Sequence, residues 1–122
     1  MSVRPFWLCA LALFFLTMVI YGALPGEADL LSAHFGDKLL HVLAYGVMTL
    51  LCFAAVSAPP LHRAAVTLGI IALLGLADES IQSLLPYRNA SIIDWCFDIA
   101  TAAIVSLLLL RARLSPDLDP HA

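Results

Sequence analysis

Charged residues are scarce in this sequence, and their scarcity excludes an ordinary soluble domain. They make up 12% of the chain, whereas hydrophobic residues make up 62%. A soluble domain is about one quarter charged and about half apolar. The 122 residues are enough for one domain only, and its interior is too small to bury so many apolar side chains. We therefore expect lipid to surround most of the surface. The net charge of −3 and the lack of a basic cluster exclude nucleic acid as a partner.

Cysteine is also rare, and the odd number of three cysteines argues against a disulfide framework. Cys9, Cys52 and Cys96 each lie in an apolar stretch, and no two of them form a C-x-x-C pair. We interpret all three as small buried or lipid-facing residues. The sequence also lacks an H-E-x-x-H motif, a phosphate-binding loop and a nucleophile elbow. It therefore offers no familiar catalytic motif.

Four long apolar segments are present, each close to the length of about 20 residues that crosses a hydrocarbon core. We predict four helices, at about residues 5–24, 37–57, 64–85 and 92–110. Proline follows each of the first three segments, where it ends a helix. The first segment has an alternative interpretation as a cleaved signal peptide, because Arg4 precedes its apolar run.

The predicted fold is all-α, an integral membrane four-helix bundle that forms one domain over residues 1–114. Small residues are expected to let its helices approach closely. These small residues are Ala44, Gly46, Gly69, Gly75, Ala100 and Ala102. Residues 115–122 include two prolines, and we expect them to form a disordered cytoplasmic tail.

The distribution of basic residues predicts the orientation of the bundle. Four spans place both termini on one side, and most arginines fall on that side, namely Arg4, Arg63, Arg111 and Arg113. Lys38 and Arg88 fall on the other side. Cytoplasmic loops carry the excess of basic residues, so both termini are predicted to be cytoplasmic.

Polar side chains recur at helical spacing in three of the four segments. The stripes are Asp37–His41–Tyr45, Asp78–Glu79–Gln82 and Ser91–Asp94–Asp98–Thr101. Residues three or four apart share one helix face. With a rise of about 1.5 Å per residue, all three stripes lie between the outer interface and the middle of the membrane. A charged side chain there costs about 2.5–3.5 kcal/mol on insertion scales, so we expect the stripes to meet in an outward-opening polar cleft.

The candidate ligand-binding residues are the polar side chains at this depth. They are Asp37, Lys38, His41, Tyr45, Asp78, Glu79, Gln82, Arg88, Ser91, Asp94 and Asp98. We expect Lys38 and Arg88 to hold an anionic group, Arg88 to pair with Glu79 or Asp94, and the apolar body of the ligand to contact Tyr45, Tyr87 and Trp95. The alternative is a purely structural polar network.

The same residues are also compatible with an enzyme. The candidate catalytic residues are Asp78, Glu79, His41 and Asp94, which carry the groups used in general acid–base chemistry. They are also able to hold a divalent cation, since oxygen ligands suit Mg²⁺ or Ca²⁺. The sequence leaves the metal and its ligands undetermined. An ion-coupled transporter is a third hypothesis, although four spans are few for one.

Two motifs resemble those of the VanZ-like family of small bacterial membrane proteins. The first runs from Asp37-Lys38 through His41 to Tyr45. The second combines Asp78-Glu79, Gln82, Pro86, Arg88, Ser91 and Asp94. The resemblance covers residues 37 to about 103. The family pattern has asparagine where this chain has Asp98, and glycines where it has Thr101, Ala102 and Ala103.

The resemblance implies a multi-pass protein of the bacterial cytoplasmic (inner) membrane. Its founding member is linked to lowered susceptibility to a lipoglycopeptide antibiotic. The expected function is binding of membrane lipid or of a lipid-linked or amphiphilic envelope ligand, with an accessory role in glycopeptide resistance or envelope homeostasis. A membrane-embedded enzyme acting on a lipid-linked substrate is the alternative.

Overall fold

The computed structural model describes residues 1–23, 37–86 and 92–114, and the side chains of residues 37, 38, 113 and 114 lie outside this description. The described chain forms a helical bundle. Its helices are α1 (Pro5–Ala23), α3 (Asp37–Ala55), α4 (Pro60–Ser83) and α5 (Ile92–Leu114). Helices α1, α4 and α5 are long and apolar enough to cross a membrane, and the apolar part of α3 is shorter. The predicted all-α membrane bundle is confirmed.

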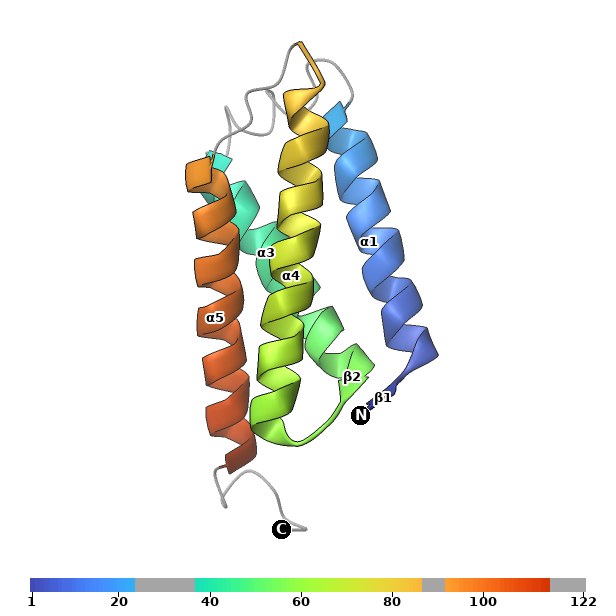
Figure 1. The fold of residues 1–122 in the computed structure, drawn as a ribbon, viewed down its shortest axis with the longest axis vertical. Helices are drawn as coiled ribbons and strands as arrows, with labels where there is room; N and C mark the ends of the chain where they lie inside the picture. The colour runs from blue at the N-terminus through green and yellow to red at the C-terminus, as the bar shows by residue number, and fades with distance from the viewer. Residues whose placement is uncertain (24–36, 87–91, 115–122) are drawn as a thin grey trace.

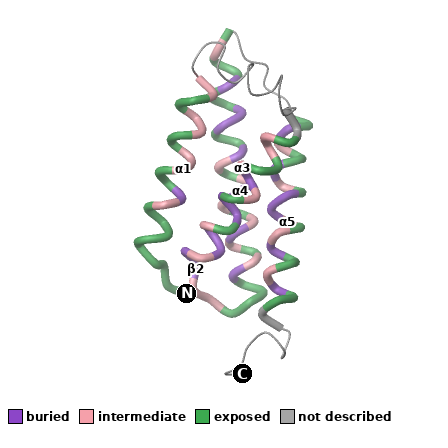
Figure 2. Tube along the Cα trace, turned by 180° about the vertical axis from the view of Figure 1, so that it is seen from behind, coloured by how far each residue is buried: buried purple, intermediate pink, exposed green. Residues whose placement is uncertain are grey.

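Helix α3 is the central element of the bundle. It crosses obliquely behind α4 and contacts α1, α4 and α5 (Figure 1). Helix α1 packs mainly on α3 and is otherwise exposed, with Leu11 as its buried residue (Figure 2). The N-terminus and the end of α5 lie at the same end of the bundle (Figure 1), which we call the terminal end. The start of α5 and the end of α4 lie at the opposite end.

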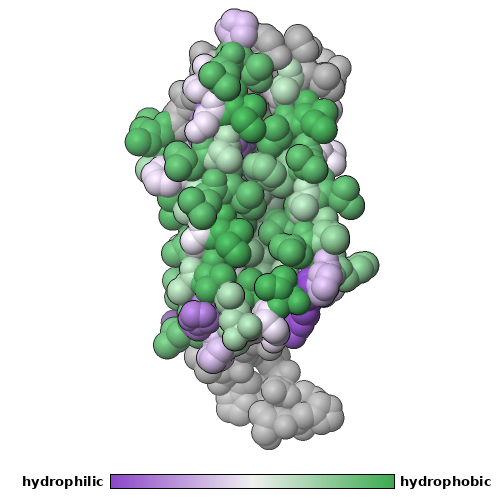
Figure 3. Space-filling view, turned by 45° about the vertical axis from the view of Figure 1, so that its right-hand side comes forward, coloured by the Kyte–Doolittle hydropathy of each residue, from purple (hydrophilic) through white to green (hydrophobic). Residues whose placement is uncertain are grey.

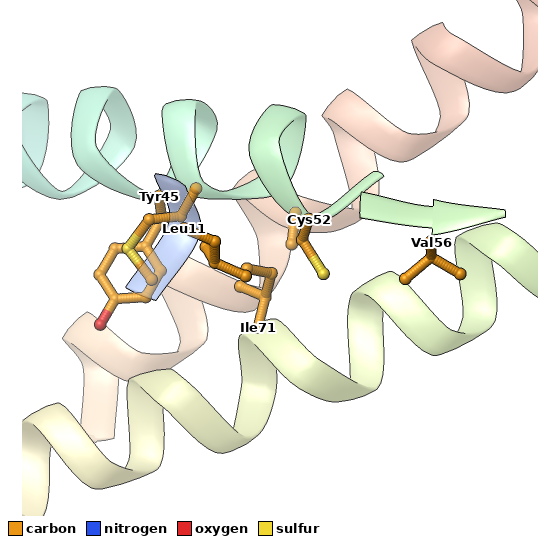
Figure 4. Packing of buried hydrophobic residues seen from close by; sticks show 7 residues of the cluster. Leu11, Tyr45, Cys52, Val56 and Ile71 are labelled. Atoms are coloured by element: carbon orange, nitrogen blue, oxygen red, sulfur yellow. The ribbon is translucent and has the colours of Figure 1, made fainter. Parts of the chain in front are cut away.

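An apolar core joins the helices in the middle of the bundle. Its buried residues are Leu11, Tyr45, Met48, Cys52, Val56, Ile71 and Ala102. Figure 4 shows several of these side chains meeting between α1, α3 and α4. In lipid, such contacts stabilise a bundle through close packing, because the surrounding acyl chains are as apolar as the core.

The outer surface of the bundle is strongly apolar. Leu73, Leu107 and Leu108 are more than half exposed, as are other large hydrophobic residues of all the helices. Figure 3 shows a broad hydrophobic band over the middle of one face, with the most hydrophilic residues near its lower end. Such a surface is unfavourable in water and suits the hydrocarbon of a membrane.

Several predicted helix ends need correction. Helix α3 ends at Ala55 and not at Ser57, because β2 (Val56–Ser57) pairs antiparallel with β1 (Ser2–Val3). Helix α4 begins at Pro60, before the predicted start at Ala64, since proline is compatible with the first helical turn. It ends at Ser83, because Pro86 disfavours helical backbone at the residue before it. Helix α5 continues to Leu114, four residues beyond its predicted end.

Two arginines close the C-terminal end of α3. Arg63 is buried in α4, where its Nε donates to the carbonyl oxygen of Phe53 at 2.6 Å and its guanidinium lies 4.2 Å from the Phe53 ring centre. Arg4 donates from Nη1 to the oxygen of Ala54 at 3.2 Å and from its backbone N–H to Ala55 at 2.8 Å. The last carbonyls of a helix lack partners within it and favour cations. Arg63 is therefore a buried helix residue, although the predicted helix began only after it, at Ala64.

Candidate functional site

Buried polar side chains of three helices meet near the end of the bundle opposite the termini. They come from the first half of α3, the last two turns of α4 and the first two turns of α5. We call them the polar cluster, which consists of His41, Tyr45, Asp78, Glu79, Gln82, Asp94 and Asp98. The periodic spacing in the sequence explains this convergence, because each helix turns one polar face inward.

His41 and Asp98 form the closest charged contact of the cluster. Nδ1 of His41 lies 2.8 Å from Oδ1 of Asp98, a separation typical of an imidazole N–H that donates to a carboxylate. Nε2 of the same ring lies 3.9 Å from Oδ2 of Asp94, one turn earlier on α5. The ring also stacks on Tyr45, with centroids 6.0 Å apart. These contacts fix the imidazole between α3 and α5.

Asp78 anchors a second group of hydrogen bonds, between α3 and α4. The hydroxyl of Tyr45 donates to its Oδ2 at 3.1 Å, and Nε2 of Gln82 donates to the same oxygen at 3.2 Å. In Figure 4 the Tyr45 ring belongs to the apolar core while its hydroxyl oxygen points away from it. Tyr45 therefore joins the core to the polar cluster.

Glu79 brings α4 close to the pair of His41 and Asp98. One donor atom from each of these three residues lies within 4.8 Å of the other two, and all three side chains are largely buried. Asp98 is fully buried, and its second oxygen, Oδ2, has no hydrogen-bond partner among the described residues. A buried carboxylate oxygen normally accepts a hydrogen bond or binds a cation, so this atom is available to a ligand.

A glycine on α4 gives Asp98 its space. A Cβ atom at Gly75 would lie 3.4 Å from Oδ2 of Asp98 and 3.0 Å from Cδ1 of Trp95. Trp95 is held there, because its Nε1 donates to the carbonyl oxygen of Ala72 at 3.0 Å. The indole of Trp95, which was expected to contact the apolar body of a ligand, links α5 to α4 through this hydrogen bond. Gly75 lies one helical turn before Glu79, so the two residues share a face of α4. This spacing in the sequence could have predicted that Gly75 lies beside the cluster.

The structure brings together all the candidate ligand-binding residues whose side chains it describes, and the four catalytic candidates are among them. The remaining candidates lie outside the described side chains, and these are Asp37, Lys38, Arg88 and Ser91. The expected pairing of Arg88 with Glu79 or Asp94, the role of Tyr87 and the tail at 115–122 lie outside the description too. Thr101, the last residue of its stripe, donates to the Phe97 carbonyl within α5.

Comparison of the chain with protein-family models, with curated proteins and with solved structures gives no match. The cluster is rich in acceptors, because four carboxylates face one imidazole, one phenol and one amide. Such a set is suited to hydroxyl, amide or ammonium donors and to cations, since an ionised carboxylate only accepts hydrogen bonds.

Proposed function

We propose that this chain is a VanZ-like protein of the bacterial cytoplasmic membrane that binds the polar headgroup of a lipid-linked or amphiphilic envelope ligand. The observation that carries the proposal is the polar cluster itself, in which three apolar helices bury four carboxylates at one level of the bundle. Ionisable residues within membrane-spanning segments are costly, and they mark ligand, ion or proton sites.

The bonding within the cluster supports a ligand over a purely structural network. A structural network in a low-dielectric interior is expected to satisfy all its buried polar atoms. Here Asp98 is the most buried carboxylate, yet its Oδ2 accepts no hydrogen bond from any described residue. Proteins break such local rules at functional sites, where a bound group offsets the cost. The sugar or peptide headgroup of an envelope ligand carries donors that fit this acceptor.

The proposed orientation follows from the arginines at the terminal end. Arg4 and Arg63 contact the end of α3 there, and Arg111 lies in the last turn of α5. Basic residues mark the cytoplasmic side of a membrane protein. The polar cluster would then lie in the outer half of the membrane, within reach of ligands from the outer leaflet. An accessory role in glycopeptide resistance or envelope homeostasis would follow from capture of such a ligand.

Lipid-resolved native mass spectrometry tests the proposal directly. The protein is released from lipid nanodiscs, and the retained lipids are compared with the bulk lipid composition. We expect enrichment of one amphiphile, and a loss of at least about tenfold in Glu79→Gln, because one charge of the cluster is removed. His62→Ala is the control, since this exposed histidine lies in the first turn of α4, whereas the cluster residues of α4 lie in its last two turns. Retained lipids that match the bulk, or equal retention in Glu79→Gln, would reject ligand binding at this site.

The contact between His41 and Asp98 favours a second candidate, a membrane-embedded enzyme. A carboxylate at 2.8 Å orients the imidazole and stabilises its protonated form, which is how a general base is positioned. Asp78, Glu79 and Asp94 are the acids and bases beside it. Turnover of a lipid-linked substrate by the purified protein, abolished in Asp78→Asn and Glu79→Gln, would select the enzyme over the binding protein.

A further inference from the structure

Three residues of the polar cluster have the arrangement of metal ligands. His41 on α3, Glu79 on α4 and Asp98 on α5 each offer one donor atom, and these atoms lie within 4.8 Å of one another. Donors bound to one ion at about 2.1 Å in tetrahedral geometry lie about 3.4 Å apart. Each donor atom therefore needs to move by at most about 0.8 Å to close around an ion.

We infer that His41, Glu79 and Asp98 bind one divalent transition-metal ion, Zn²⁺ or Mn²⁺, between the three helices. The donor set indicates the class of metal. Mg²⁺ and Ca²⁺ take oxygen ligands, whereas an imidazole nitrogen with two carboxylates suits Zn²⁺ and Mn²⁺. The sequence suggested Mg²⁺ or Ca²⁺ and did not place Asp98 among the ligands, because it gave no distances between the helices.

The environment of Asp98 is the independent observation that supports an ion. Its Oδ1 lies 2.8 Å from His41, while its fully buried Oδ2 has no hydrogen-bond partner among the described residues. Gly75 leaves room beside Oδ2, because a Cβ at that position would approach it to 3.4 Å. A divalent cation would satisfy this oxygen, which an apolar neighbour cannot do.

Asp78 differs from the three proposed ligands although it lies in the same cluster. Its Oδ2 already accepts two hydrogen bonds, from Tyr45 and from Gln82. It adds negative charge near the ion without joining the set of three donors. This difference supplies a charge-matched comparison for the ligand Asp98, since both residues lose one charge on conversion to asparagine.

The ion would complete the headgroup site. Three protein ligands leave at least one coordination position for water or for an oxygen of a second molecule. Contact of the bound ion with a phosphate or carbonyl of an envelope ligand rests on the proposed function. Binding of the ion to the protein does not depend on the proposed function.

The test is a titration of the purified full chain, stripped with EDTA in detergent, with Zn²⁺, Mn²⁺ and Mg²⁺ by calorimetry. We expect one saturable equivalent of Zn²⁺ or Mn²⁺, bound at least about tenfold more tightly than Mg²⁺. Asp98→Asn and Glu79→Gln should each weaken this binding by at least about tenfold. His62→Ala, at an exposed position outside the cluster, should change it by less than about threefold. Asp78→Asn should weaken it less than Asp98→Asn does, because Asp78 acts only through its charge near the ion. Absorption bands of bound Co²⁺ should report a nitrogen–oxygen ligand set in the wild type and in His62→Ala, and these bands should be lost in Asp98→Asn and Glu79→Gln.

Two results would overturn the metal site. One is the absence of a saturable equivalent of either ion in the wild type, which needs no variant. The other is an unchanged affinity of Glu79→Gln for the metal ion. Because this variant is nearly isosteric, it still tests the site if Asp98→Asn fails to fold. Native mass spectrometry with and without EDTA separates this outcome from that of the proposed function. Lipid retained without metal would leave headgroup binding intact, whereas metal bound without enriched lipid would leave the metal site intact.

Discussion

Nδ1 of His41 lies 2.8 Å from Oδ1 of Asp98, a residue 57 positions later in the chain. This contact links α3 to α5 inside the bundle, where Asp98 is fully buried and His41 is largely so. A hydrogen bond to a charged group contributes about 1.5–3 kcal/mol in soluble proteins. Average side-chain hydrogen bonds between membrane helices contribute less, about 0.6 kcal/mol. The charge and burial of this pair favour the upper part of the membrane range.

The first prediction is a coupling free energy between His41 and Asp98. In a double-mutant cycle with His41→Gln and Asp98→Asn, we expect coupling of about 1–2 kcal/mol in the free energy of unfolding in detergent. The control cycle combines His41→Gln with Ser106→Ala, since Ser106 lies about 12 Å further along α5 than Asp98. Additive effects in both cycles would show that the contact does not stabilise the bundle.

The second prediction concerns Gly75, where α4 and α5 are in close contact. Gly75→Ala places a methyl group 3.0 Å from Cδ1 of Trp95, which its hydrogen bond to Ala72 holds in place. We expect a loss of about 1–3 kcal/mol in stability, the usual cost of overpacking. Gly69→Ala is the matched control, because nothing lies within 4 Å of the added methyl. It should raise stability by about 0.5–1 kcal/mol, as alanine favours a helix. Equal effects in both variants would contradict the proposed packing.

Hydrophobic length and polar periodicity were sufficient to predict the bundle and the convergence of its polar side chains. The spacing of four between His41 and Tyr45, and between Asp94 and Asp98, places each pair on one helix face. Apolar runs then require those faces to point inward, away from lipid. The hydrogen-bond partners on different helices could not be predicted, because the spacing of residues along one helix gives no distance to another helix. The bond from Tyr45 to Asp78 is one example.

Predictions from the local sequence pattern were wrong where tertiary contacts decide the conformation. Arg63 follows two prolines and a histidine, a composition typical of a loop, yet contact with Phe53 buries it in α4. Val56 continues an apolar run, but it pairs with Val3 of β1, near the start of the sequence. Gly69 was expected to allow close approach between helices, and it faces open space. In each case the outcome depends on how the elements pack against one another, which the pattern along one segment does not give.

The third prediction concerns Arg63 as a residue that fixes the end of α3. Arg63→Ala removes a buried hydrogen bond of 2.6 Å to Phe53 and a cation–π contact. We expect a loss of at least about 2 kcal/mol in unfolding free energy. Arg63→Lys should recover only part of it, because an ammonium lacks the planar stacking surface. Arg111→Ala, at an exposed position, should change stability by less than about 0.5 kcal/mol. A loss in Arg63→Ala no larger than this would contradict the assignment.

The fourth prediction is the orientation of the bundle in the membrane. Reporter proteins fused after Arg113 or inserted next to Arg63 should be cytoplasmic, since basic residues concentrate at the terminal end. Reporters inserted near Ala28 or Asn89 should be external. Paired reporters, one active only in the cytoplasm and one only outside it, provide the control for expression. A cytoplasmic signal at Ala28 would move the polar cluster to the inner half of the membrane.

The fifth prediction separates the stability of the polar cluster from its function. Glu79→Gln and Asp94→Asn preserve side-chain shape and remove one charge each from a group of four carboxylates. Like charges in close proximity destabilise one another, so the melting temperature should stay the same or rise. Asp98→Asn is the contrasting variant, because it weakens the buried contact with His41 and should lower the melting temperature. Lipid retention is measured on the same three preparations.

These paired measurements distinguish a binding site from a structural network. If the cluster only holds the helices together, retention of the amphiphile should fall in proportion to stability, and Asp98→Asn should be the most affected. If the cluster binds the headgroup, Glu79→Gln and Asp94→Asn should lose at least about tenfold in retention at unchanged melting temperature, since carboxylate acceptors of the ligand are lost. A variant that keeps both stability and retention would exclude its residue from the site. Function lost at full stability would therefore locate the activity in the carboxylates of α4 and α5.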